Sequence, residues 1–183
     1  TPGGQFNIGL TPSVAKIATV ALIRRFRADF PAATITVNEA LSSYLVEWLM
    51  MGRIDAAVMY DIANTPLIDT HALFSEEFFL IGSNAAARTV GKHAPDAVRL
   101  KDIGRYPLVI PGRMHAIRRI VETRAAELGV KLSIALEVDA VSSILDLVSE
   151  GYGYAVLPLN AASSDPLKRQ FTINRITHPT LFR

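Results

Sequence analysis

Residues 147–158 have the sequence Leu147-Val148-Ser149-Glu150-Gly151-Tyr152-Gly153-Tyr154-Ala155-Val156-Leu157-Pro158. The first residues of this stretch complete the apolar face of a helix, and Gly151 then allows the backbone to turn. Ala155 to Leu157 are apolar, as in a buried strand, and Pro158 ends the run. The stretch therefore predicts a helix, a tight turn and a buried strand, which together form one unit of an α/β fold.

The first third of the chain repeats this alternation of strand and helix. Thr11-Pro12 is a typical helix start, and Phe30-Pro31 ends that helix. A strand is predicted before this helix, at residues 6–10, and another after it, at 34–37. A second helix follows at 42–51 and a third strand at 55–60. Strand, helix, strand, helix, strand in this order is the pattern of a parallel sheet with right-handed crossovers.

A second α/β lobe is predicted beyond residue 83. A strand at 78–81 precedes the boundary, and Leu108 to Ile110 begin the next alternation. A helix from about Met114 to Leu128, a strand at 134–138 and a helix that Asp139 can cap come next. Strands at 154–157 and from Phe171 complete the lobe. The chain is thus expected to form two α/β lobes.

Composition excludes several classes of protein. The absence of cysteine removes disulfide scaffolds and thiolate sites, and suits a reducing cytosol. The net charge is only +2, and the one basic cluster, Arg24, Arg25 and Arg27, is interpreted as a solvated helix face and not as a nucleic-acid patch. No signal peptide and no apolar run of roughly 18 residues is found. We therefore expect a cytoplasmic protein with no membrane contact.

Catalytic and metal-binding motifs are also missing. The histidines His71, His93, His115 and His178 are far apart in the sequence and lack metal-ligand spacing. No G-x-S-x-G elbow, Walker loop or G-x-G-x-x-G motif follows a predicted strand. We therefore predict no catalytic residue, no metal and no cofactor, although a site assembled from distant residues stays open.

The polar helix starts are the most informative candidates for binding. Free backbone amides at the start of a helix attract anions, and here they follow strands at Thr11-Pro12-Ser13 and Ser42-Ser43. Pro111-Gly112-Arg113 is predicted to open a third helix and to add a guanidinium. The alternative is that each of these residues only caps its helix and binds no ligand. Their convergence at the ends of parallel strands favours a ligand site.

The quoted stretch resembles the L-V-x-x-G-x-G-x-x-x-L-P segment of LysR-type transcription regulators of bacteria. Three further segments look like landmarks of that family in the same order: residues 6–10, residues 24–31 and residues 52–57. The resemblance implies two Rossmann-like lobes of the type II periplasmic-binding-protein fold. It also implies a homodimer or homotetramer that binds DNA only through an N-terminal winged helix-turn-helix, which this chain lacks. Thr1-Pro2-Gly3-Gly4 fits the end of a linker from such a domain.

The resemblance also implies an effector cleft between the lobes. It maps the cleft onto the ligand-binding residues Thr11, Ser13, Ser42, Tyr60, Pro111, Gly112, Arg113 and Asp139. A small organic anion, a carboxylate or a sulfonate, is the expected effector. Lobe I is expected at 5–83 with 177–183 as the start of its return, and lobe II at 84–176, with hinges near 82 and 176.

Residues 39–61 further resemble the branch of the family that includes nitrogen-assimilation regulators. One departure is that family members add a strand and a helix after the return to lobe I, so a C-terminal tail is expected to be missing here. Two alternatives share the fold: a solute-binding protein of a transporter, which requires export, and an enzyme such as a dehydratase, which requires a titratable group in the cleft.

Overall fold

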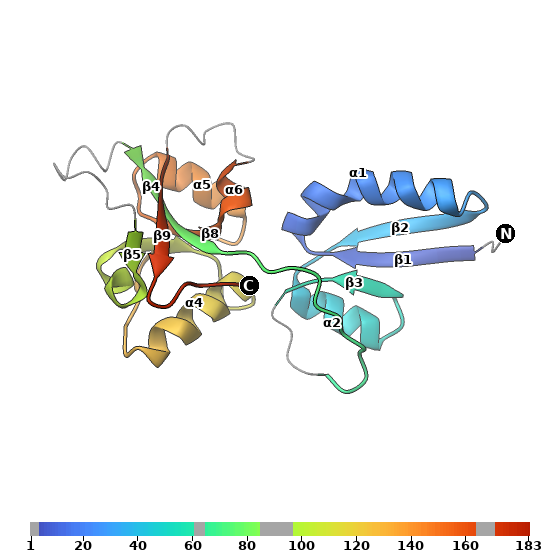
Figure 1. Ribbon diagram of the computed structural model, residues 1–183, viewed down its shortest axis with the longest axis horizontal. Helices are drawn as coiled ribbons and strands as arrows, with labels where there is room; N and C mark the ends of the chain where they lie inside the picture. Colours follow the sequence, from blue (N-terminus) through green and yellow to red (C-terminus); the bar gives the residue numbers. More distant parts are fainter. Residues whose placement is uncertain (1–3, 61–64, 85–96, 164–170) are drawn as a thin grey trace. The chain divides into compact units, whose positions relative to one another are not determined.

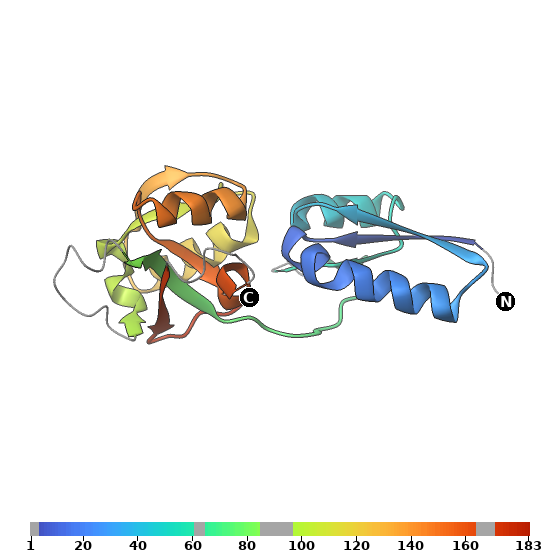
Figure 2. The ribbon, with the colours of Figure 1, turned by 90° about the horizontal axis from the view of Figure 1, so that it is seen from above.

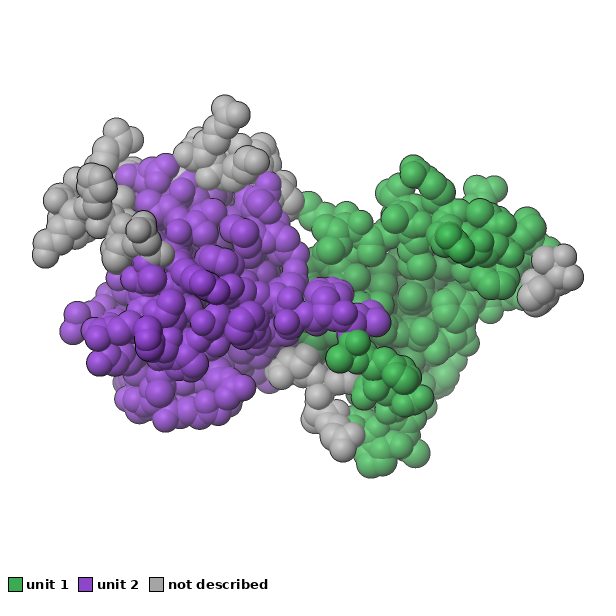
Figure 3. Space-filling model, viewed as in Figure 1, with its two compact units in different colours: residues 1–72 green, residues 73–183 purple. Residues whose placement is uncertain are grey.

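A computed structural model describes residues 4–60, 65–84, 97–163 and 171–183 of the chain. The linker predicted for Thr1 to Gly4 lies outside these ranges except for Gly4. The chain forms two compact units, Thr1–Ala72 and Leu73–Arg183 (Figure 3). Each unit has its own sheet and its own helices, so the prediction of two α/β lobes is confirmed.

Unit 1 is a three-stranded parallel sheet between two helices (Figure 1). Its elements are β1 (Gly4–Leu10), α1 (Pro12–Asp29), β2 (Ala33–Glu39), α2 (Ser42–Met50) and β3 (Ala56–Val58). The strand order is β2-β1-β3. The first right-handed crossover runs from β1 to β2, and the second runs from β2 back past β1 to β3, so their directions are opposite and they place α1 and α2 on opposite faces (Figure 2). Side chains alternate accordingly: the ring of Phe6 stacks on Phe26 of α1, whereas Gly9 lies against Leu45 of α2.

Unit 2 is a mixed sheet with helices around it (Figure 1). Its strands are β4 (Phe78–Ser83), β5 (Ala97–Arg99), β6 (Pro107–Ile110), β7 (Ser133–Glu137), β8 (Ala155–Pro158) and β9 (Phe171–Thr177). Its helices are η1 (Leu100–Arg105), α4 (Ala116–Glu127), α5 (Val141–Ser149) and α6 (Leu159–Ser163). The strands pair in the orders β5-β9-β4-β8 and β6-β7. Backbone hydrogen bonds from Val109 to Tyr154 and from Tyr154 to Pro107 join the two sets.

The stretch at 147–158 forms the predicted helix, turn and strand. Gly151 adopts φ 86° directly after α5, a backbone conformation that favours glycine. Gly153 lies so close to β6 that a Cβ atom would be 2.6 Å from the Pro107 carbonyl oxygen. Ala155, Val156 and Leu157 of β8 are buried in the core of unit 2.

The units divide earlier in the chain than the predicted lobe boundary at residue 83. β4 is antiparallel to both β8 and β9, so its hydrogen bonds hold it in unit 2. Residues 177–183 also belong there: the Phe78 amide donates to Leu181, and the Arg183 guanidinium lies 2.6 Å from the Glu76 carboxylate. These contacts join residues 177–183 to unit 2. The expected return to lobe I and the hinges stay predictions.

In the part of the chain that the structure describes, no helix is long and apolar enough to cross a membrane. The same residues contain no group of three or more His, Cys, Asp or Glu side chains placed to hold a metal ion. His93 lies outside the described residues.

Candidate functional site

Three of the predicted binding residues meet at the carboxyl edge of the sheet in unit 1. Thr11 directly follows β1, Ser42 opens α2 after β2, and Tyr60 follows β3. The Thr11 amide donates to the Val58 carbonyl at 3.2 Å, and the Tyr60 amide donates to the Ser42 hydroxyl at 3.1 Å. Ligands of α/β proteins bind beyond the carboxyl ends of parallel strands, where successive crossovers reverse direction, and the two crossovers of unit 1 reverse in this way.

Thr11 has a buried hydroxyl that does not cap its helix. It is the N-cap residue of α1, with φ −70° and ψ 153°, and Pro12 takes the first helical position as predicted. Its side chain accepts no capping hydrogen bond, although only 5% of the residue is exposed. Thr11 Oγ1 has no hydrogen-bond partner in the structure. The capping alternative considered for Thr11 is therefore wrong, and Ser13 lies beside it in the first turn of α1.

The start of α2 contains a second pair of hydroxyls. Leu41 is the N-cap residue, and neither serine caps the helix through its side chain. Ser42 is buried and accepts the hydrogen bond from Tyr60, which fixes the position of its oxygen. Ser43 Oγ is also buried and has no hydrogen-bond partner in the structure. The Ser42-Ser43 pair was visible in the sequence, but which hydroxyl is satisfied depends on the fold.

The electrostatic environment of this edge favours negative charge. The first turns of α1 and α2 contain no acidic residue. Both helices direct the positive ends of their dipoles toward this edge, because both begin there. Glu39, the last residue of β2, is the acidic side chain nearest in sequence to the start of α2. Unit 1 therefore offers hydroxyls and helix starts to a ligand.

In unit 2 the prediction that Pro111-Gly112-Arg113 opens a helix is wrong. α4 begins at Ala116, and its N-cap residue is His115, whose Nδ1 accepts a hydrogen bond from the Ile117 amide at 3.2 Å. Residues 112–115 form a turn closed by a 3.0 Å bond from the His115 amide to the Gly112 carbonyl. The Arg113 side chain is 79% exposed and lies 3.7 Å from Glu122.

Asp139 also has a different role from the predicted one. Ala140 is the N-cap residue of α5, and no side chain caps that helix. Asp139 Oδ1 instead accepts a 2.9 Å hydrogen bond from the Gly112 amide. The Gly112 amide, which was predicted to be free to bind an anion, thus donates to a carboxylate of the chain itself. Whether Pro111, Gly112, Arg113 and Asp139 contact an effector stays a prediction.

Arg118 holds this loop and was missed in the sequence. It lies in α4 with only 3% of its side chain exposed, and it donates to the Pro111 carbonyl and to Glu137 of β7. Its Nε is 2.7 Å from Glu122 one turn later. The i,i+4 spacing of Arg118 and Glu122 was a visible signal, but such pairs usually lie on solvated faces.

Burial and the nearby Arg183 lower the pKa of His115 to about 4.

A surface pocket of about 280 Å³ lies elsewhere in unit 2 and contains none of the predicted residues. It is lined by Glu76, Glu77, Phe79, Pro158, Leu159 and Asn160. The Glu76 carboxylate in it is already paired with Arg183 and accepts from Asn160. None of these contacts indicates a ligand, and we assign the pocket no function.

The chain matches the LysR substrate binding domain family over residues 1–181. It belongs to that family. The LysR domain is 27% identical over 179 residues to the nitrogen assimilation regulatory protein nac of Escherichia coli, covering 97% of the chain and 56% of that protein. It is also 27% identical over 163 residues to the transcriptional regulator BbuR of Bordetella bronchiseptica, covering 88% of the chain and 49% of BbuR. The chain thus spans about half the length of the curated relatives it matches.

Among solved structures, the LysR domain resembles the effector binding domain of QuiR in complex with shikimate. The TM-score is 0.83 at 17% identity, over 100% of this chain and 85% of that one. This similarity confirms the predicted type II periplasmic-binding-protein-like fold. The family and the relatives are transcription regulators and not enzymes, so neither the transporter nor the enzyme alternative is favoured. The predicted resemblance to nitrogen-assimilation regulators is confirmed as well.

Proposed function

We propose that this LysR domain senses a small organic anion, a carboxylate or a sulfonate, at the start of α1 in unit 1. The observation that carries the proposal is the Thr11 hydroxyl, which is buried without a hydrogen-bond partner at the N-terminus of an 18-residue helix. A buried hydroxyl without a partner costs about 1–3 kcal/mol. An acceptor oxygen of a ligand would remove that cost.

Ser42 supports an acceptor ligand through the direction of its hydrogen bond. Its oxygen accepts from the Tyr60 amide, so its own hydroxyl hydrogen can be donated onward. Thr11 Oγ1 and Ser43 Oγ can donate in the same way, and the Val14 amide in the first turn of α1 is not capped by the side chain of Thr11. Donors without a nearby first-turn carboxylate suit an anion better than a cation.

The related structure of QuiR was solved with shikimate, which is itself an organic carboxylate. We propose the same class of ligand, an organic carboxylate, for the present domain, and we do not propose shikimate itself. In our proposal the effector also reaches the second lobe, as the family resemblance implies. That location, with the contribution of Pro111, Gly112, Arg113 and Asp139, stays a prediction.

The test is a thermal-shift screen of the domain against carboxylates and sulfonates, each paired with its neutral amide. A hit is then titrated into the wild-type domain and into Thr11→Val, which keeps the shape of the side chain and removes its donor. Thr19→Val is the matched control, because Thr19 Oγ1 is in the same helix but donates to the Ala15 carbonyl. We expect Thr11→Val to weaken binding about tenfold, as the loss of a hydrogen bond to a charged group does, and Thr19→Val to leave it unchanged.

We further propose that effector binding is transmitted in a homodimer or homotetramer to a winged helix-turn-helix elsewhere in the full-length protein. The domain alone is then expected not to bind DNA. A mobility-shift assay that compares the full-length protein with the domain, with and without effector, tests this part. Tight, sequence-specific binding by the isolated domain would contradict it.

A further inference from the structure

We propose that Lys16 binds the anionic group of the effector and makes unit 1 selective for a charged acid over its neutral analogues. This inference rests on the proposed anion site at the start of α1. It adds a binding residue, and it narrows the ligand class to acids that are ionised when bound.

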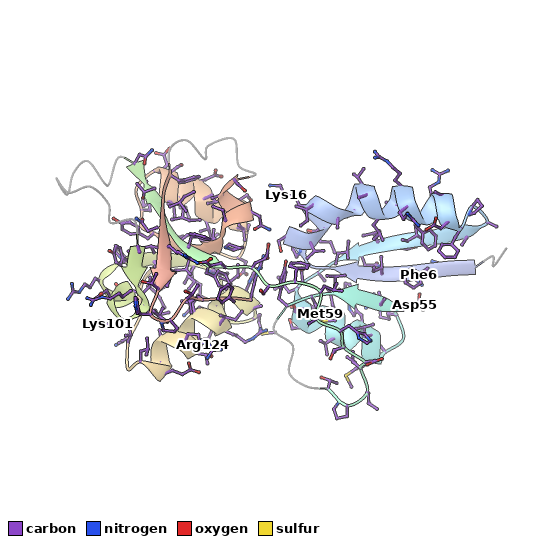
Figure 4. All side chains as sticks on the ribbon, viewed as in Figure 1. Phe6, Lys16, Asp55, Met59, Lys101 and Arg124 are labelled. Atoms are coloured by element: carbon purple, nitrogen blue, oxygen red, sulfur yellow. The ribbon has the colours of Figure 1, made fainter. Side chains whose placement is uncertain are left out.

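Lys16 lies one helical turn from the start of α1. Lys16 lies in the second turn of α1, three residues after Ser13 and four after Pro12. Helical side chains lean toward the N-terminus of their helix, so from this position the ammonium of Lys16 can reach the first turn. Figure 4 shows Lys16 at the end of α1 where the helix begins, on the side of unit 1 where β1 ends.

The charge of Lys16 is also available to a ligand. Lys16 is exposed, and it forms no salt bridge or hydrogen bond with any residue that the structure describes. Arg25 of the same helix, in contrast, pairs with Asp29 at 2.6 Å. Glu39 at the end of β2 is the carboxylate to consider as a rival partner, since it shares a sheet face with Leu10, and it is not within salt-bridge distance of Lys16.

A lysine at this place gives selectivity for charge and tolerance of shape. The start of α1 contributes about half a positive charge, and the ammonium adds a full one. An ammonium is a mobile point charge on a flexible stem, so it accepts a carboxylate or a sulfonate without the two-point geometry that a guanidinium requires. A neutral amide would keep the hydrogen bonds to Thr11 and lose this attraction.

The experiment uses methanesulfonate and its nearly isosteric neutral analogue methanesulfonamide as probes. Each is titrated into ¹⁵N-labelled domain at low and constant ionic strength, and the shift of the Val14 amide reports binding. The proteins are the wild type, Lys16→Met, Lys16→Arg and, as control, Lys101→Met, which removes an exposed lysine of unit 2. Lys16 is exposed, so its replacement should not disturb the fold.

We expect the wild type to bind methanesulfonate about fivefold more tightly than the amide, which is the upper end of the range for an exposed ion pair. Lys16→Met should lose most of this preference, because only the charge at the start of α1 is left, whereas Lys16→Arg and Lys101→Met should keep it. An unchanged preference in Lys16→Met overturns the role of Lys16 and leaves the anion site standing, whereas no preference in the wild type contradicts both proposals. If neither probe shifts Val14 in the wild type, both proposals are wrong.

Discussion

The backbone amide of Tyr60 donates a 3.1 Å hydrogen bond to the hydroxyl of Ser42. This contact joins the segment after β3 to the first turn of α2, and both residues are buried. It fixes one hydroxyl at the carboxyl edge of unit 1 while those of Thr11 and Ser43 stay without hydrogen-bond partners. The three hydroxyls therefore differ in their energetics, and each can be tested by removing it.

Ser42→Ala and Ser43→Ala should differ in their effect on stability. Ser42→Ala removes the acceptor of a buried amide and should lower the free energy of unfolding by about 1–2 kcal/mol. Ser43→Ala removes a buried hydroxyl without a partner and should be neutral or slightly stabilising. Urea unfolding of the two variants beside the wild type measures the difference. Equal destabilisation by both would mean that the hydroxyls are equivalent in solution.

Thr11→Val should stabilise the domain in the absence of effector. The valine keeps the shape of threonine and removes a buried polar group without a hydrogen bond, so we expect a gain of about 1 kcal/mol. Thr19→Val removes a satisfied hydroxyl from the same helix and should bring no such gain. Thermal unfolding without ligand checks both variants. A clear loss of stability in Thr11→Val would show that its hydroxyl is already satisfied.

Arg118 should be more important for stability than Arg124, which lies in the same helix and also pairs with a glutamate. Arg118→Met leaves Glu122 and Glu137 without their buried guanidinium and frees the Pro111 carbonyl, so we expect a loss of about 3 kcal/mol. Arg124 pairs with Glu127 on the surface, and Arg124→Met should cost less than about 1 kcal/mol. Denaturant titrations, followed by a signal from unit 2, compare the free energies of unfolding of the two variants. Similar losses would contradict the role given to Arg118.

The pKa of His115 predicts a pH dependence of unit 2. Burial lowers this pKa from 6.5 to about 4, so the fold favours the neutral ring that accepts from the Ile117 amide. The stability from this group is complete above pH 6.5 and is lost as the pH falls toward 4. His115→Asn keeps a capping acceptor without this titration and should show a shallower fall over the same window. Identical pH profiles for the two proteins would rule this out.

The sequence predicted the elements of unit 1, with the starts of α1 and α2, better than the start of α4 in unit 2. β2 and α2 were found because their apolar periodicity is local and strong. The start of α4 was misplaced, since the turn at 112–115 depends on Asp139, which lies 27 residues further along the chain. The grouping of β4 with unit 2 likewise depends on its pairing with β8 and β9, which no local pattern records.

Within the candidate site, the sequence identified residue types but not their hydrogen-bond state. Thr11 and Ser42 were chosen as helix starts, and both lie at the predicted edge of the sheet. That Ser42 is satisfied and Thr11 is not follows from the position of Tyr60, which only the folded chain fixes. Arg118 was overlooked for a related reason, because burial turns an ordinary surface pair into a support of the loop.

The most direct test of the anion site is a crystal structure of the domain with an acid found in the screen. We predict an oxygen of its anionic group within about 3 Å of Thr11 Oγ1, at hydrogen-bond distance. If the acid is bound elsewhere and the Thr11 hydroxyl stays buried without a partner, the proposed site is wrong.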